Sequence, residues 1–471
     1  MVLAACLPAP AKEYSISSPD GRLVISVQQN SDALRWSVSL DGTQALQPSE
    51  LSVSTQKAVF GPGVRIRKAV VRTLDESFDT PFYRKSSVRD NCRTLLLSCN
   101  GEFDLEFRAY NDAAAYRFIA KSPLTIENEQ AEFNFSEDFP ALVPYINDNR
   151  SGERYCFAFE SYYDSTTISG MHADSLAINP LAICLPEGRK AVIMDAGVEN
   201  YPGMFLKKGE GNSLVAEFAP YPAESANDPR SRLNLIPVRR APYIASLDKA
   251  GALPWRVVVL THDDTQLPDC DIAQILAPEC RVPDALQWIK PGKVSWDWWN
   301  NFDLTGVDFH AGMNTETYKY YIDFASKYGL EYIILDEGWS TEQSLQDVSG
   351  KVDLEELVNY GESRGVGLIL WSSWRNMIKD TEKDMAHYEA MGIKGFKVDF
   401  FDRDDQQICA SSYEIAECAA RHHLLLDYHG FRPSGIQRAY PNILNFEGVK
   451  GLENSKWEPR DSRGPVNDQP L

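Results

Sequence analysis

The sequence predicts a β-sandwich domain followed by a (β/α) barrel, and three observations support this division. Up to about residue 280, short runs of alternating apolar and polar residues are separated by turn-forming pairs such as Asp41-Gly42. Beyond about residue 290, apolar strands alternate with helical segments. Acidic residues recur where these later strands end, at the rim where a TIM barrel carries its chemistry.

The pattern in the first part of the chain predicts many short strands. Residues 22–27, 34–40 and 94–98 have strand length, and we find no long amphipathic helix among them. Many short strands with frequent turns are typical of a sandwich. The predicted divisions are a signal or linker remnant, a β-sandwich domain and a barrel domain, at residues 1–12, 13–280 and 281–471.

The second part predicts repeated strand–helix units whose strands are apolar on both faces, as in a covered parallel sheet. The turn after the first strand, residues 298–301, lacks a glycine-rich fingerprint, which favours a barrel over an open dinucleotide-binding sheet. The expected strands are residues 294–299, 332–336, 367–371, 395–400, 424–428 and 443–446. The expected helices are residues 315–328, 354–364, 381–391 and 412–422.

A closed (β/α)8 barrel needs two more strands than this pattern supplies. Residues 461–471 are polar and lose the periodicity. We therefore expect a barrel that is truncated after about six strands.

The net charge of −20 disfavours nucleic acid and anionic membrane surfaces as partners, and it fits a neutral ligand or a bound cation. Residues 3–6, Leu-Ala-Ala-Cys, match a bacterial lipoprotein cleavage box, although a chance match is the alternative. We expect a lipid anchor through Cys6 and a periplasmic or outer-membrane-anchored protein. Cys270 and Cys280 are spaced so that they could pair in such an oxidising compartment.

Asp399 is the sharpest candidate for chemistry. It closes the apolar segment 395–400, and Lys397 precedes it by two positions. Burying two charged groups costs several kcal/mol unless they pair with each other or serve a function that requires them. Asp399 could attack an anomeric carbon, with Lys397 holding it ionised or binding sugar hydroxyls. A structural ion pair at the barrel mouth is the alternative.

Two glutamates near the end of the pattern, Glu447 and Glu453, offer further carboxylates. A glycosidase needs a second carboxyl group that stays protonated near neutral pH, and Glu453 is our candidate. Glu447 suits a hard cation such as Ca²⁺. On spacing alone, solvated loop glutamates are an equally good interpretation.

Other residues at the strand ends could line a sugar site. Asp336 could bind sugar hydroxyls, and Trp339 could stack on a ring face. Trp296 and Trp371 are further candidate platforms, although a single Trp is more often part of a core. His429 is a candidate substrate contact, with a structural histidine as the alternative.

Together these segments resemble glycoside hydrolase family 97. Seven segments carry the resemblance. They are SWDWWN (295–300), YIILDEGW (332–339), GFKVDF (395–400), HGFRPSG with RAYPN (429–442), NFEGVKGLE (445–453), FESYYD (159–164) and NYPGMFL (200–206). It implies an N-terminal β-super-sandwich, a (β/α)8 barrel and a small C-terminal β-domain. The last two barrel strands and the C-terminal domain are not found in this sequence.

The resemblance also implies a mechanism. The family's inverting branch has His-Glu after strand five, and that Glu is its base; this sequence has His429-Gly430 there. The retaining branch has an Asp nucleophile at the end of strand four, the place of Asp399. Retention implies that the carboxyl groups of Asp399 and Glu453 lie about 5–5.5 Å apart.

By this resemblance the protein is expected to be a retaining α-galactosidase, with Asp399 as nucleophile and Glu453 as acid/base. Glu160, Glu447 and Glu453 are implied as ligands of Ca²⁺. The alternatives are an α-glucosidase or β-L-arabinopyranosidase of the same family. A non-catalytic carbohydrate-binding protein is a further alternative, but it would not need the paired carboxylates.

Overall fold

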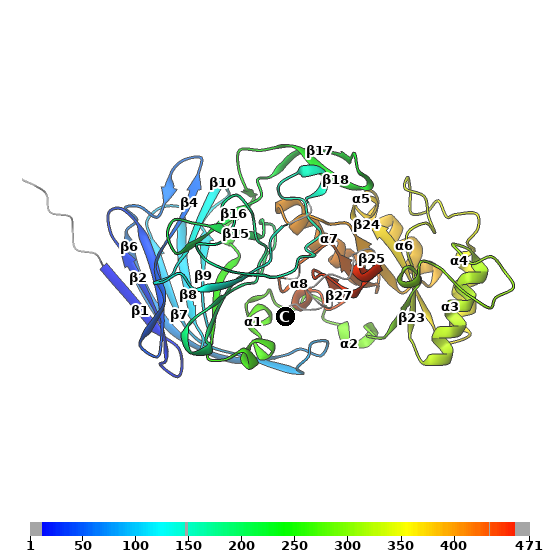
Figure 1. Ribbon diagram of the computed structural model, residues 1–471, viewed down its shortest axis with the longest axis horizontal. Helices are drawn as coiled ribbons and strands as arrows, with labels where there is room; N and C mark the ends of the chain where they lie inside the picture. Colours follow the sequence, from blue (N-terminus) through cyan, green and yellow to red (C-terminus); the bar gives the residue numbers. More distant parts are fainter. Residues whose placement is uncertain (1–11, 147–148, 433, 457–471) are drawn as a thin grey trace, which may run out of the picture.

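The computed structural model describes residues 12–146, 149–432 and 434–456. It consists of a β-rich domain, which lies at one end of the molecule, and an α/β domain at the other (Figure 1). Cys6 lies outside the described residues. Among the helices that the structure describes, none is long and apolar enough to cross a membrane.

The first large sheet of the β-rich domain is antiparallel. Its strands are β1 (Lys12–Ser17), β2 (Leu23–Gln29), β3 (Leu34–Leu40), β4 (Thr43–Thr55), β5 (Val59–Phe60), β10 (Leu124–Asn134), β15 (Met204–Lys208), β16 (Ser213–Phe218) and β19 (Ala245–Leu247). The main order is β1-β2-β3-β4-β10-β16-β15.

The second large sheet is also antiparallel. Its strands are β6 (Ile66–Asp79), β7 (Ser87–Cys99), β8 (Phe103–Ala109), β9 (Ala113–Ala120), β11 (Pro140–Val143), β12 (Asp164–Thr167), β13 (Leu181–Cys184), β14 (Lys190–Ala196), β20 (Gly251–Ala252) and β21 (Trp255–Thr261). The main order is β12-β11-β13-β14-β21-β9-β8-β7-β6.

The two sheets share one hydrophobic core, because alternate side chains of their strands face each other. Along β2, Leu23, Ile25 and Val27 are fully buried, while the residues between them are partly exposed. Trp36 of the first sheet and Tyr116 of the second meet edge-on, with ring centroids 5.0 Å apart. The sequence-predicted sandwich is therefore present as two packed sheets.

A buried ion pair joins the two sheets inside this core. Arg256 on β21 donates to both carboxylate oxygens of Glu129 on β10, at 2.7 and 2.8 Å. The Tyr201 hydroxyl donates to the same carboxylate at 2.8 Å. Both charged side chains are essentially inaccessible to solvent.

The α/β domain contains a parallel sheet with strands in sequence order, and six of them lie in the described residues. They are β22 (Val294–Trp296), β23 (Tyr332–Leu335), β24 (Gly367–Ser373), β25 (Gly395–Asp399), β26 (Leu425–His429) and β27 (Ile443–Glu447). The sheet curls into a half-barrel, which fits the expected truncated barrel.

Four longer helices alternate with these strands and are α3 (Thr315–Tyr328), α4 (Leu354–Glu362), α6 (Thr381–Met391) and α7 (Gln406–Arg421). The short helices are α1 (Ile272–Leu276), α2 (Ala285–Trp288), α5 (Trp374–Met377) and α8 (Ile436–Ala439). The 3-10 turns are η1 (Arg150–Gly152), η2 (Pro186–Gly188), η3 (Asp264–Asp269), η4 (Asp297–Asn300) and η5 (Leu452–Lys456).

Several predicted elements have different bounds in the structure, and two of these differences have a clear local cause. The first strand ends at Trp296, because residues 297–300 turn away as η4. Helix α7 begins six residues earlier than predicted, at Gln406, because the side chain of Asp405 accepts from the backbone N–H of Ile408 and caps it. Cys270 and Cys280, whose spacing would have allowed a disulfide, are both free thiols.

A two-stranded hairpin, β17 (Pro222–Asp228) with β18 (Ser231–Arg240), reaches from the β-rich domain towards α5 of the half-barrel (Figure 1). Near its turn, the guanidinium of Arg232 pairs with Glu337 at 2.7 Å. The side chain of Arg375 donates to the backbone carbonyl of Arg232. The hairpin therefore connects the β-rich domain to the rim of the parallel sheet.

We expect Arg256→Met to reduce the stability of the protein by about 3–5 kcal/mol, because the Glu129 carboxylate would stay buried without its counter-charge. Unfolding in denaturant, followed by tryptophan fluorescence, measures the change. The matched control is Arg239→Met, which removes an exposed pair with Glu224 and should leave stability almost unchanged. Equal effects of the two substitutions would contradict this account of the core.

Candidate active site

The parallel register brings most of the predicted site residues to the carboxyl edge of the sheet. Lys397 on β25 lies opposite Trp371 on β24 and Asp427 on β26. One step closer to the edge, His429 lies opposite Glu447. Because parallel strands all end at the same edge, side chains far apart in sequence converge there.

Lys397 is the buried cation of this edge. Its side chain is 3% exposed, and its Nζ lies 2.9 Å from Asp336 Oδ2 and 3.6 Å from Asp399 Oδ2. The ammonium also lies over the ring of Trp296, 4.4 Å from its centroid. Burial acts to lower the pKa of Lys397, but the two carboxylates outweigh it and raise that pKa. Lys397 is therefore charged at neutral pH.

Asp399 ends β25 with both carboxylate oxygens engaged. Trp371 Nε1 donates to Oδ2 at 3.1 Å, and the backbone N–H of Phe400 donates to Oδ1 at 2.6 Å. Burial acts to raise the pKa of Asp399, but Lys397 and His429 outweigh it and hold that pKa below its usual value. The side chain is thus an ionised, oriented carboxylate, which is the form that a nucleophile requires.

His429 lies between two carboxylates at the end of β26. Its Nε2 is 3.2 Å from Asp427 Oδ2, and its Nδ1 is 2.8 Å from Glu447 Oε2. Burial acts to lower the pKa of His429, but Asp427 and the hydrogen bonds raise it to about 10. The ring is therefore an imidazolium that adds positive charge beside Asp399.

Glu453 lies on η5, beyond the last strand. Trp298 Nε1 donates to its Oε1 at 2.7 Å. Burial and the repulsion of Glu447 raise the pKa of Glu453 above its usual value, which favours the protonated form. Glu453 and Asp399 are thus pushed towards opposite protonation states.

Glu160 comes from the β-rich domain and approaches this end of the sheet. The side-chain amide of Asn454, next to Glu453, donates to Glu160 Oε2 at 2.7 Å. Burial and the repulsion of Glu447 raise the pKa of Glu160 to about 7. Acidic side chains that repel one another in this way suit a hard cation, which would supply the missing positive charge.

Asp336 and Asp297 form a second acidic pair at the first two strands. Asp336 is buried, and its carboxylate accepts from Trp296 Nε1 at 2.6 Å and from the backbone of Glu337 at 2.8 Å. Asp297 accepts from the Tyr318 hydroxyl at 2.7 Å. Burial and the repulsion of Asp336 raise the pKa of Asp297 to about 7. The sequence analysis assigned no role to Asp297. Its position at the end of a strand was the signal that could have marked it as a site residue.

The tryptophans have different roles from those predicted. Trp296 is partly exposed and could still contact a ligand. Trp371 is 6% exposed and orients Asp399 through its indole N–H. The prediction that Trp339 stacks on a sugar is wrong, because Trp339 is fully buried against Tyr388 and donates to the backbone carbonyl of Trp371. Trp339 supports the strand end from inside the core.

One cluster with metal-ligand side chains lies away from this edge, on α6 and α7. Glu382, Cys418 and His422 have ligand atoms within 4.8 Å of one another. The guanidinium of Arg421 lies 2.6 Å from the Glu382 carboxylate, and His422 pairs with Glu389 at 2.8 Å. These contacts already account for the cluster as an ion-pair network between two helices.

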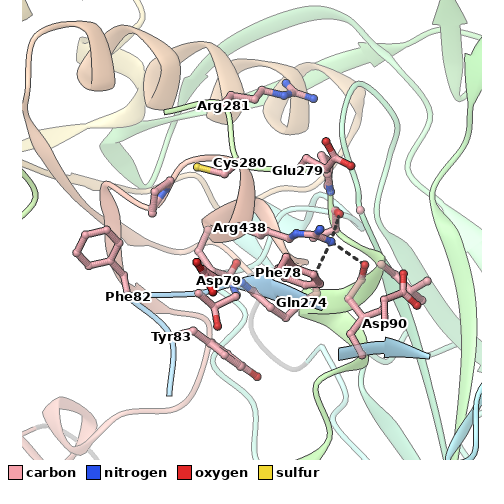
Figure 2. A pocket seen from close by; sticks show the side chains of 18 of the residues that line it. Phe78, Asp79, Phe82, Tyr83, Asp90, Gln274, Glu279, Cys280, Arg281 and Arg438 are labelled. Carbon is pink, nitrogen blue, oxygen red and sulfur yellow. Dashed lines mark hydrogen bonds between the residues drawn. The ribbon is translucent and has the colours of Figure 1, made fainter. Parts of the chain in front are cut away.

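A cavity of about 970 Å³ also lies away from the predicted site. Figure 2 shows its lining, in which the guanidinium of Arg438 lies over the ring of Phe78, 3.7 Å from its centroid, and Phe82 and Tyr83 lie to their left. None of the predicted catalytic, substrate or metal residues is among the residues that line it. This cavity is therefore separate from the carboxylates at the strand ends and is not evidence for a substrate site there.

Comparison with known proteins places the chain among glycoside hydrolases. It is 40% identical over 456 residues to the retaining alpha-galactosidase of Bacteroides thetaiotaomicron, which covers 95% of this chain and 69% of that protein. It is 28% identical over 473 residues to a probable retaining alpha-galactosidase of Streptomyces bingchenggensis, covering 96% and 68%.

Solved structures share the fold at lower identity. A glycoside hydrolase family 97 enzyme of Pseudoalteromonas sp. strain K8, in complex with acarbose, superposes with a TM-score of 0.81 at 20% identity, covering 94% of this chain and 70% of that one. A beta-arabinopyranosidase superposes with a TM-score of 0.78 at 23% identity, covering 94% and 71%.

Two family descriptions match successive parts of the chain. Residues 16–278 match "Glycosyl-hydrolase 97 N-terminal", and residues 296–449 match "Glycoside hydrolase 97". With the first match covering more than half of the sequence, and a relative at 40% identity, the chain belongs to glycoside hydrolase family 97.

Proposed function

We propose that this protein is a retaining glycoside hydrolase that releases terminal α-galactosyl residues, with Asp399 as nucleophile and Glu453 as general acid/base. The observation that carries the proposal is the opposite tuning of two carboxyl groups. The pKa of Asp399 is lowered, whereas the pKa of Glu453 is raised. The relative at 40% identity bears the name of this activity.

The proposed reaction has two displacement steps. In the first, the Asp399 carboxylate bonds to the anomeric carbon while Glu453 gives its proton to the departing glycosidic oxygen. In the second, Glu453 takes a proton from water, the water oxygen bonds to the anomeric carbon, and Asp399 leaves as a carboxylate. Two inversions leave the anomeric configuration of the sugar unchanged.

Packing around Gly430 supports retention over inversion. The resemblance implies that the inverting branch uses a glutamate here as its base. A Cβ atom at Gly430 would lie only 2.3 Å from Asp402 Oδ1, and the φ of Gly430 is +61°. The structure therefore has no space for a side chain at this position unless Asp402 moves.

We propose that Glu160, Glu447 and Glu453 hold a Ca²⁺ ion. Their carboxylate chemistry fits a hard cation, and the raised pKa of Glu160 reflects its burial and the repulsion of Glu447. When bound, the ion would supply positive charge beside the site. Glu160 belongs to the β-rich domain, so its carboxylate would contribute to the site from outside the parallel sheet.

Finer features of the family are proposed with this function. They are the (β/α)8 type of the barrel, of which six strands lie in the described residues, the super-sandwich form of the first domain, and a periplasmic, lipid-anchored location through Cys6. The sugar itself is proposed as galactose. A β-L-arabinopyranoside, the alternative, lacks only the C6 hydroxymethyl group, and pockets discriminate weakly against such a deletion.

Asp399→Gly should reduce hydrolysis of an aryl α-galactoside by several orders of magnitude, because the carboxylate that forms the covalent bond is missing. Added azide should then restore turnover and yield a galactosyl azide of inverted configuration. Proton NMR of the wild-type reaction should show α-galactose as the first-formed anomer. First-formed β-galactose would overturn retention, and faster turnover of an arabinopyranoside would overturn the choice of sugar.

Lys397→Met should move the acidic limb of the pH profile of kcat/KM upward. Lys397 lowers the pKa of Asp399, and that carboxyl must be ionised to react, so removing the cation raises the pH at which activity is lost. Lys383→Met, an exposed change on α6, is the matched control. An acidic limb that stays in place for Lys397→Met would refute the role of this cation.

Chelation of calcium should lower both activity and melting temperature, and added Ca²⁺ should restore both. Glu160→Gln should require more Ca²⁺ for half-maximal activity, about tenfold or more, because one charged ligand is lost. Titration of the chelated protein, with Mg²⁺ as the comparison ion, measures this. Full activity in excess chelator would exclude the proposed ion from the reaction.

A further inference from the structure

We propose that Asp402, held by Arg150 and Asn234 of the β-rich domain, positions the nucleophile Asp399. The proposal rests on the function proposed above and adds residues to it that do not touch the substrate. These three side chains form the Asp402 clamp. The clamp fixes the loop that follows β25, residues 400–405, and this loop supplies a backbone hydrogen bond to the nucleophile.

The orientation of Asp399 depends on an unusual backbone conformation. Its Oδ1 accepts from the backbone N–H of Phe400, and Phe400 has a φ of +59°. Asp402 follows with a φ of +49°. A left-handed conformation of a residue other than glycine costs about 1–3 kcal/mol and persists only where its surroundings enforce it. The enforcing contacts must therefore lie around this loop.

Asp402 makes those contacts. Its Oδ2 accepts from Arg150 Nε and from Asn234 Nδ2, both at 2.7 Å. Its backbone carbonyl accepts from the N–H of Phe157 at 2.7 Å, and its own N–H donates to the carbonyl of Gly430 at 2.8 Å. The residue is 3% exposed, so each of these bonds is made away from solvent.

The β-rich domain holds the loop from several directions. Arg150 lies on η1, Asn234 lies on the β17–β18 hairpin, and Phe157 lies between η1 and Glu160. Further along the loop, Gly203 N–H donates to the carbonyl of Asp404 at 2.8 Å. Arg403 donates to a hairpin carbonyl at 3.1 Å. The first domain therefore determines where the nucleophile loop can lie.

A displaced loop would affect the reaction more than the fold. The Phe400 N–H would no longer face Asp399, and a misplacement of about 1 Å at a reacting group can reduce a rate by about 10²-fold. Substrate binding through other side chains would change less. This difference separates a positioning role from a purely structural one.

The experiment measures how fast Asp399 reacts. A fluorinated galactosyl compound that traps the covalent intermediate is incubated with the full chain, and intact mass and peptide mapping follow the label on Asp399. At a temperature at which the variant is folded, Arg150→Met should lower the trapping rate constant by about 10²-fold, with little change in the concentration for half-saturation. Its melting temperature should fall as well, because Asp402 would stay buried without its counter-charge. Arg150→Lys, which restores the cation, should recover part of the rate.

The matched control is Arg154→Met in the same segment of the β-rich domain. Arg154 pairs with Glu217 at 2.7 Å, and neither of these residues belongs to the Asp402 clamp. Its trapping rate should equal that of the wild type. If Arg150→Met does not fold, Asn234→Ala removes the second donor from the hairpin and should also slow trapping.

The outcomes distinguish the two proposals. If the wild-type protein is labelled at Asp399 and the variants react as fast as the wild type, the clamp is overturned and the proposed function still stands. A slower rate that tracks a loss of melting temperature, without recovery in Arg150→Lys, also overturns the clamp. Wild-type protein without label on Asp399 overturns the proposed nucleophile and the clamp together.

Discussion

The buried ammonium of Lys397 is the interaction on which the acidic edge of the sheet depends. Asp336 and Asp399 come from different strands and would repel each other without the cation between them. Because all three groups lie in a region of low dielectric, the attraction is strong, and loss of one partner would leave an expensive unpaired charge. Charge balance at this edge thus keeps Asp399 ionised and links the ends of β23 and β25, which lie on either side of β24.

The β-rich domain belongs functionally to the same edge. It contributes Glu160 to the acidic group, and its residues Arg150 and Asn234 hold the loop that follows Asp399. Its own rigidity comes from two packed sheets and the ion pair between Arg256 and Glu129 in their core. A stiff domain can hold a strained loop in place, whereas a flexible one would let Phe400 relax.

The sequence predicted the order of strands and helices well, because each segment shows apolar periodicity and acidic residues such as Asp399 mark the strand ends. It did not predict that Trp339 is buried, because the sequence around a tryptophan at the rim resembles that around a core tryptophan. The two can be told apart only when the neighbouring strands are placed. Asp402 and Arg150 were missed for a related reason. They are 252 residues apart, and nothing local marks a contact between domains.

The close approach of Gly430 to Asp402 has an evolutionary consequence. A side chain could be gained at position 430 only if Asp402 moved, because its Cβ would lie 2.3 Å from Asp402 Oδ1 and Asp402 is held by two hydrogen bonds. A carboxylate at position 430 would therefore need a second, compensating change at or around Asp402.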